Sequence, residues 1–316
     1  MKNIKTTLLG VTLVVASSMS WAQDYPTRNI SLVSPYPPGG TSDLVARAIS
    51  GGFENALGRT VTVVNRAGAG GAVGGGFVAG ADPNGYTLGL LTTTPLLMAP
   101  LNNDLPYGAE SFEYVCRAFD NPLILTARND ADYDDLAGFL EYAQNSPTPI
   151  RYYTAGAGGL QDVATVAFAS RGDFEGVAIP LSGDQPAVQN LLSGVINVAM
   201  LTSGVILSNP DGLKPIAVMS TDRLNRLPNV PTFLESGYDL NYSLWGAIVA
   251  PKGTPDHIVA TLGNACEVAM QGPEFERLMG QLSMEVLYQS GKDFEPLFMT
   301  QVENTLESLR EMGFVD

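Results

Sequence analysis

The segment at residues 37–43 has the residue types of an anion-binding loop. Gly39 and Gly40 follow two prolines, and Thr41 and Ser42 come next. Glycines let backbone N–H groups approach a ligand closely, and the first turn of a following helix offers free N–H groups with a partial positive charge. A carboxylate fits such a site without a cationic side chain. The alternative is a strand-to-helix turn in which the glycines only relieve strain.

Hydroxyl side chains also follow predicted strands in both halves of the chain. Placed at a strand end, a hydroxyl can donate a hydrogen bond to a ligand oxygen. Each residue taken alone is better explained as a turn or helix-cap residue, but the recurrence in both halves favours a binding role. The residues are Thr92, Thr93, Thr94, Thr154, Thr202 and Ser203.

Other chemistries lack the residues they require. Residues 39–41 have no lysine for a phosphate-binding P-loop, and residues 68–73 lack the last glycine of a dinucleotide fingerprint, so close packing of turn and helix explains that second cluster better. No serine has glycines two positions before and after it, which rules out a nucleophile elbow. The one histidine, His257, follows a proline-rich turn and is expected to be a solvated helix-start residue. The sequence therefore predicts no catalytic residue and no cofactor.

A metal site is not expected either. One histidine and two distant cysteines cannot form a typical zinc site. The acidic residues at 130–135 lack the glycine and the final glutamate of a calcium loop. Helix capping and a solvated acidic face explain this cluster.

The charge balance excludes nucleic acid as a partner. The formal net charge of the chain is −15, and removal of residues 1–22, with Lys2 and Lys5, would leave 15 − 32 = −17. Nucleic-acid binding needs a cationic surface. The field of so acidic a protein also repels small anions at long range, so an anion site must rely on short-range backbone donors.

Residues 1–22 have the pattern of a secretory signal. Lys2 and Lys5 precede an apolar stretch at residues 8–16, and small residues come before position 23. The remaining chain of about 294 residues is longer than one core usually supports, so two domains are expected. No later apolar run reaches the roughly 18 residues that a spanning helix needs. These features predict export across the cytoplasmic membrane.

Strands alternate with helices along the chain. The pattern predicts a mostly parallel sheet in each half and one ligand site in the crevice between the halves. A short helix is expected after residue 231, and the C-terminal segments are expected to be helical. Strands are predicted at residues 29–34, 60–64, 86–91, 123–127, 150–153, 176–179, 195–201, 214–219 and 244–250, and helices at 41–49, 136–144, 162–170 and 185–193.

Cys116 and Cys266 are the only cysteines of the chain. In an exported protein an even number of cysteines is compatible with a disulfide. Two buried thiols that act as small apolar groups are the alternative.

Several motifs, in order along the chain, resemble the tripartite tricarboxylate transporter receptors, also called Bug proteins. The resemblance covers nearly all of the chain after residue 22. Its motifs lie at residues 25–26, 37–43, 46–47, 64–71, 83–88, 183–187, 227–232, 235–237, 245 and 250–255.

The resemblance implies an α/β fold of the periplasmic-binding-protein type II kind. Residues 23–122 and 232–316 would form one lobe and residues 123–231 the other, joined by hinge strands with the ligand cleft between them. The implied function is capture of a small organic acid in the periplasm, such as a di- or tricarboxylate, an aromatic acid or an amino acid, by a monomer that delivers it to the membrane subunits of the transporter. The ligand-binding residues expected from the resemblance and from the strand-end hydroxyls together are Tyr36, Pro38, Gly39, Gly40, Thr41, Ser42, Thr92, Thr93, Thr94, Thr154, Gly156, Gly158, Gly159, Asp162, Gly183, Thr202 and Ser203.

The second-lobe loop departs from the family pattern. Gly159 stands where many members have Ser or Thr, and Asp162 where many have His. If Asp162 faces the cleft, it disfavours a second ligand carboxylate by repulsion, and if it caps the helix, it says nothing about selectivity. A sensing receptor that presents the acid to a membrane sensor protein is the alternative function.

Overall fold

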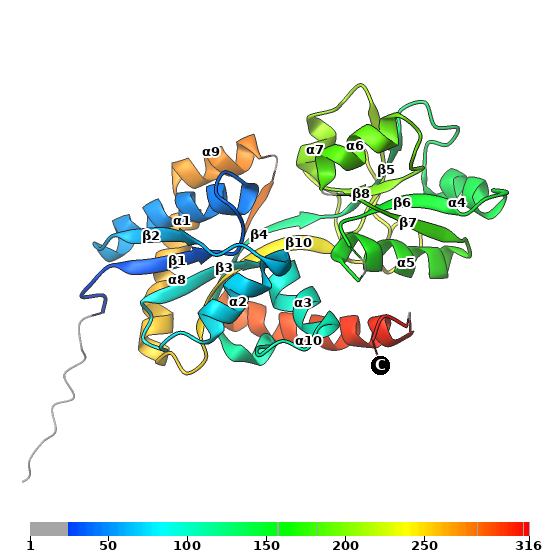
Figure 1. Ribbon diagram of the computed structural model, residues 1–316. Coiled ribbons are helices and arrows are strands. Elements are labelled where there is room, and N and C mark those ends of the chain that lie inside the picture. The colour runs from blue at the N-terminus through cyan, green and yellow to red at the C-terminus, as the bar shows by residue number, and fades with distance from the viewer. Residues whose placement is uncertain (1–24, 157, 182, 283, 312, 316) are drawn as a thin grey trace, which may run out of the picture.

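The computed structural model describes residues 25–311 except 157, 182 and 283, together with residues 313–315. The predicted signal at residues 1–22 lies outside the described residues. Figure 1 shows two groups of strands and helices joined by extended chain segments.

The strands form three sheets. A six-stranded sheet has the order β11-β4-β10-β3-β1-β2, a three-stranded sheet the order β8-β5-β9, and a two-stranded sheet pairs β6 with β7. The strands are β1 (Ile30–Ser34), β2 (Val61–Asn65), β3 (Thr87–Thr92), β4 (Phe112–Pro122), β5 (Ile124–Arg128), β6 (Ile150–Thr154), β7 (Gly176–Pro180), β8 (Ala199–Leu201), β9 (Leu213–Val218), β10 (Ser243–Pro251) and β11 (Glu285–Ser290).

The helices cover these sheets. They are α1 (Thr41–Leu57), α2 (Ala72–Ala79), α3 (Ala99–Asn102), α4 (Leu136–Gln144), α5 (Leu160–Gly172), α6 (Asp184–Leu192), α7 (Ser203–Leu207), α8 (Asp256–Met270), α9 (Pro273–Gln281) and α10 (Gly291–Glu311). Two short 3₁₀ turns are η1 (Ala69–Gly71) and η3 (Ala109–Ser111), and η2 (Thr94–Met98) is a short π-helix. We call the six-stranded sheet and its helices the first lobe, and β5–β9 with α4–α7 the second lobe. The expected two-lobe α/β fold is thus confirmed.

The prediction of mostly parallel sheets is wrong. β1 pairs in parallel with β2 and β3, but β10 pairs antiparallel with β3 and β4, and β11 with β4. In the second lobe, β5 pairs antiparallel with β8 and β9, and only β6 and β7 are parallel. The long strands β4 and β10 lie side by side and run between the lobes (Figure 1), which makes them the connections between the two halves.

The structure also contains two strands that were not predicted and lacks one predicted helix. β4 and β11 were not expected, because neither segment stands between the turn and helix signals that marked the other strands. The short helix expected after residue 231 is wrong, since residues 233–237 form turns.

The first lobe is held by packing of α1 against α8 and by a disulfide. Apolar side chains of α1, including Val45, Ile49 and Phe53, are fully buried. A Cβ at Gly52 would collide with Ala269 of α8, so the two helices approach more closely than any larger residue allows. Cys116 of β4 and Cys266 of α8 are joined in a disulfide, which decides between the two alternatives for these cysteines.

The connection between the lobes is well packed on one side. Trp245 of β10 is 1% exposed and lies 5.2 Å and 5.1 Å, centroid to centroid, from Phe294 and Phe298 of α10. Apolar packing of this density holds β10 rigidly on the first lobe. The C-terminal helix therefore supports the strand that leads into the second lobe.

Candidate functional site

The glycine loop of the first lobe lies between β1 and α1. Gly39 has a φ of +85°, a conformation that favours glycine, and Gly40 is the N-cap of α1 with a φ of −78°. Residues 37–41 are exposed. The helix begins at Thr41, and no side chain caps it.

Asp43 holds this loop in place instead. Its carboxylate accepts hydrogen bonds from the N–H of Gly39 at 2.9 Å and from Nε of Arg47 at 2.9 Å. The amide of Asn65, at the end of β2, donates to the same carboxylate at 2.9 Å and to the carbonyl of Tyr36 at 3.0 Å. Hydrogen bonding from Arg47, followed by that from Gly39 and Asn65, outweighs burial and lowers the pKa of Asp43 to about 2. The buried carboxylate of Asp43 thus fixes the turn in which Gly39 has a positive φ.

Donors beside this clamp stay free. No hydrogen bond between described residues uses the N–H groups of Gly40, Thr41 or Ser42. The hydroxyl oxygens of Ser34, the last residue of β1, and of Ser42 are buried without a hydrogen-bond partner among the described residues. A buried polar group without a partner costs free energy, and native proteins rarely contain one unless a ligand or water uses it. The loop therefore presents unused neutral donors next to an exposed glycine turn.

Tyr36 joins three segments at the same place. Its phenol oxygen lies 3.0 Å from Oγ1 of Thr92 and donates to the carbonyl of Gly70 at 3.4 Å. Thr94 also hydrogen-bonds to Tyr36. Burial raises the pKa of the Tyr36 phenol, so it stays protonated at neutral pH. The structure thus brings together the predicted residues Tyr36, Thr92 and Thr94.

The hydroxyl of Thr93 makes hydrogen bonds within the protein. It is fully buried, its hydroxyl donates to the carbonyl of Ser243 at 3.1 Å, and the same oxygen accepts from the N–H of Trp245 at 2.9 Å. These bonds tie the end of β3 to the strand β10. The hydroxyl of Thr93 is therefore used in the connection between lobes.

Asp43 gives a testable pH dependence. We expect Asp43→Asn to be less stable than the unmodified protein at pH 7 by about 1–3 kcal/mol, because charged hydrogen bonds are lost. The folded-state pKa of about 2 lies below the ordinary 3.8, so this stabilisation is present above pH 4 and disappears as the pH falls toward 2. Urea unfolding of both proteins from pH 7 to pH 2 should show converging stabilities.

A matched control is Asp256→Asn, which alters an exposed acid in the first turn of α8. It should change stability by no more than about 0.5 kcal/mol. Equal stability of Asp43→Asn and the unmodified protein at pH 7 would show that the clamp is not needed.

The second lobe repeats the same clamp. Gly158 has a φ of +68°, Gly159 is the N-cap of α5 with a φ of −71°, and the N–H of Gly158 donates to Asp162 at 2.9 Å. Tyr152 donates to the other oxygen of Asp162 at 2.6 Å. Asp162 is 3% exposed. Both carboxylate oxygens are therefore occupied within the second lobe, which favours the alternative in which Asp162 orders the helix start and does not face a ligand.

The two loops are built alike in detail. Gly39 and Gly158 have positive φ, the next residue in each is a glycine N-cap, and an aspartate four positions after the first glycine accepts its N–H at 2.9 Å. The pattern Gly-Gly-x-x-Asp at residues 39–43 and 158–162 is the sequence signal that could have predicted this. The loops differ in one respect, because the N–H of Gly159 donates to the carbonyl of Gly156 at 3.0 Å, whereas that of Gly40 has no such bond among the described residues.

Among the other predicted residues of the second lobe, two hydroxyls are already hydrogen-bonded and two glycines border open space. The hydroxyl of Thr154 is used within its own loop, because it donates to the carbonyl of Gly156 at 2.7 Å. Ser203 is buried and donates to Asn121 of β4 at 3.3 Å. A Cβ at Gly156 or Gly183 would meet no atom within 4 Å, so both glycines border open space. Thr202 is the half-exposed N-cap of α7, and residue 157 of the loop lies outside the described residues.

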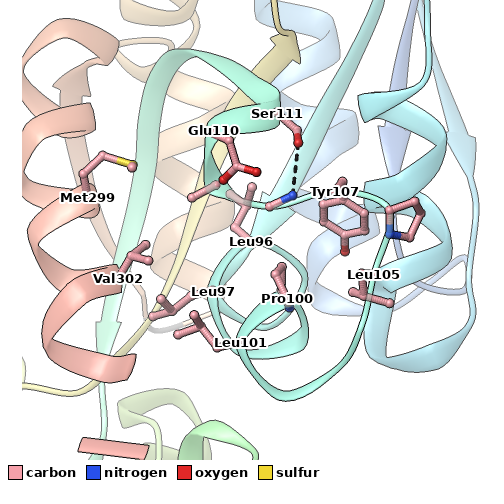
Figure 2. Close-up of a pocket in the computed structure, with 13 residues that line it drawn as sticks. Leu96, Leu97, Pro100, Leu101, Leu105, Tyr107, Glu110, Ser111, Met299 and Val302 are labelled. Carbon is pink, nitrogen blue, oxygen red and sulfur yellow. Dashed lines mark hydrogen bonds between the residues drawn. The ribbon is translucent and has the colours of Figure 1, made fainter. Parts of the chain in front are cut away.

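Two cavities lined by described residues lie away from these loops. One of about 560 Å³ lies between α3, the segment before β4, and α10, where Leu97, Leu101, Met299 and Val302 line it (Figure 2). Another, of about 420 Å³, lies between the ends of α4 and α5 in the second lobe. The ligand crevice between the lobes therefore stays a prediction.

The residues considered for metal or acid–base chemistry have structural roles. Asp135 caps α4 by accepting from the N–H of Gly138 at 2.8 Å, and Asp134 pairs with Lys214 at 2.6 Å. Both observations confirm the capping and the solvated acidic face. His257 is exposed in the first turn of α8, as expected. In the part of the chain that the structure describes, no helix has the length and apolar character needed to cross a membrane.

Comparison with known proteins places these features in a family. The family described as "Tripartite tricarboxylate transporter family receptor" matches residues 45–314. Protein BugT of Bordetella pertussis is 32% identical over 79% of this chain and 78% of its own length.

Solved structures agree with this placement. A TctC solute binding protein from Polaromonas has a TM-score of 0.83 at 28% identity, covering 91% of this chain and 99% of its own. MatC from Rhodopseudomonas palustris, solved with bound malate, has a TM-score of 0.75 at 25% identity, covering 90% of this chain and 100% of its own. This chain belongs to the tripartite tricarboxylate transporter receptor family, whose fold and function are those of solute-binding receptors and not of enzymes.

Proposed function

We propose that this protein captures a small organic carboxylate outside the cytoplasmic membrane and delivers it to the membrane subunits of a tripartite tricarboxylate transporter. Membership of the receptor family supports both the transport role and the periplasmic location. The malate bound to MatC supports a carboxylate as the ligand.

The observation that carries the proposal is the set of unused donors in the first lobe. The free N–H groups of Gly40, Thr41 and Ser42 stand at the start of a 17-residue helix, where the helix dipole adds a partial positive charge. The orphaned hydroxyls of Ser34 and Ser42 lie in the adjoining strand end and first turn. These neutral groups can bind a carboxylate at short range, although the acidic protein repels anions at long range.

The remaining binding residues follow from this anchor. We propose that the carboxylate contacts the loop at residues 36–42, with Pro38 and Gly39 shaping the loop, and that Thr92 and Thr94 complete its first-lobe site. The second-lobe groups at Gly156, Gly158, Gly159, Gly183 and Thr202 then approach the other end of the acid. In this arrangement Asp162 positions the loop, and Thr93 and Ser203 hold the connection between lobes.

Domain closure would bring the two sets of groups together. We propose that residues 123–231 form the moving lobe, with residues 23–122 and 232–316 as the other, and that the chain acts as a monomer. β4 and β10 would bend at their second-lobe ends, because the packing of Trp245 on α10 holds β10 on the first lobe. Hinge closure around a ligand is the usual motion of periplasmic receptors.

The test is direct binding of acids to the purified mature chain. Native mass spectrometry would identify any acid retained through purification. Calorimetry would then use malate, citrate, glutamate, adipate and benzoate, with the matching amides and alcohols as controls. We expect at least one acid to bind, and its amide to bind at least about 100-fold more weakly, since loss of a charge-assisted contact costs several kcal/mol. Equal affinity for an acid and its amide would overturn the proposal.

A further inference from the structure

A hydrogen bond joins the two lobes away from the connecting strands. Asn102 is the last residue of α3, which follows β3 and η2 in the first lobe. Its side-chain amide donates to the carbonyl of Gly158 in the second-lobe loop at 2.7 Å and to the carbonyl of Met98 at 2.9 Å. One side chain therefore links the C-terminal end of α3 to the glycine loop across the interface.

The acceptor of this bond is held firmly from its own side. The N–H of Gly158 is bound by Asp162, which Tyr152 also contacts, so the glycine cannot move independently of α5 and β6. A Cβ at Gly158 would lie 2.9 Å from Oδ1 of Asn102. Only glycine permits both the φ of +68° and this close approach.

We propose that Asn102 is a latch residue that holds the two lobes in the arrangement of this structure by binding Gly158. This inference rests on the proposed receptor function and adds a positioning residue to it. The bond connects a first-lobe helix directly to the loop that would cover the acid. A net hydrogen bond of ordinary strength changes a two-state population by about fivefold.

The latch can be tested without any ligand. Spin labels at Asp82→Cys and Ser170→Cys, two exposed positions after α2 and in α5, report the distance between lobes by pulsed electron resonance. The two native cysteines are bonded to each other, so only the introduced ones react with the label. We expect Asn102→Ala to shift the population about fivefold away from the distance of the unmodified protein, and Asn102→Asp to shift it further, because a carboxylate repels the carbonyl of Gly158.

Asn103→Ala is the matched control. Asn103 has the same side chain at the next position and donates to the carbonyl of Ala99 at 2.9 Å, within its own lobe. Its removal should leave the distances unchanged. The latch is overturned if Asn102→Ala and Asn102→Asp both keep the distances of the unmodified protein, or if Asn103→Ala changes them equally. The distance measurement uses no acid, so a negative result would say nothing against acid binding. In the same way, a protein that bound none of the acids could still be tested for the latch.

Discussion

Gly40→Asp should abolish acid binding while the protein remains folded. The φ of −78° at Gly40 suits any residue, and a Cβ there would lie 3.7 Å from the carbonyl of Pro37, an ordinary contact. Aspartate is a good N-cap, so stability should stay within about 0.5 kcal/mol. Its carboxylate would bind the free N–H groups of α1 in place of the ligand and repel the ligand's charge. Like charges placed together cost several kcal/mol, so calorimetry should show a loss of at least about 100-fold.

Two variants at the same position separate charge from size. Gly40→Asn has the shape and capping ability of aspartate without its charge and should lose less affinity. Gly40→Ala adds only the Cβ and should lose least. If Gly40→Asp binds the acid recovered from the native protein as tightly as the unmodified chain does, the helix start of α1 is not the anion site.

Removal of the disulfide should give the largest change in stability. The bond joins residues 150 positions apart, and closing so long a loop restricts the unfolded chain by about 5 kcal/mol in the chain-entropy treatment. Both cysteines are fully buried, so Cys116→Ala/Cys266→Ala also loses packing between β4 and α8. Urea unfolding should therefore show a lower midpoint for this variant, and for the unmodified protein after reduction in denaturant.

Acid binding is the internal control for that experiment. The disulfide joins a first-lobe strand to α8, while the glycine loops lie at strand and helix ends elsewhere. The folded variant should therefore keep its affinity within about threefold, since distant sites act independently. If the free energy of unfolding falls by less than about 1 kcal/mol, the packing of α1 on α8 holds this lobe without the disulfide.

The clamps show how far reasoning from the sequence reached. The loop at residues 37–43 was correctly placed between a strand and a helix, because prolines, glycines and apolar spacing act locally. The bond between Asp43 and Asn65 was not predicted, because Asn65 reaches the carboxylate only once β2 lies beside β1. The bond to Arg47 is local, since Arg47 lies four positions after Asp43 on the same helix. Asp162 was open to two interpretations for the same reason, since its partner Tyr152 lies on a neighbouring strand and its direction depends on how α5 packs.

The order of strands, helices and glycine turns came from the sequence alone, since each depends on neighbours a few residues away. The sequence motifs also predicted the family, and the negative net charge predicted that neutral donors would bind an acid. Only the tertiary structure decided which donors remain free: Thr93 bonds to a strand 152 positions away, and Asn102 to a loop 56 positions away. Such pairings depend on how sheets and lobes pack, and they cannot be predicted from the spacing of residues along the chain.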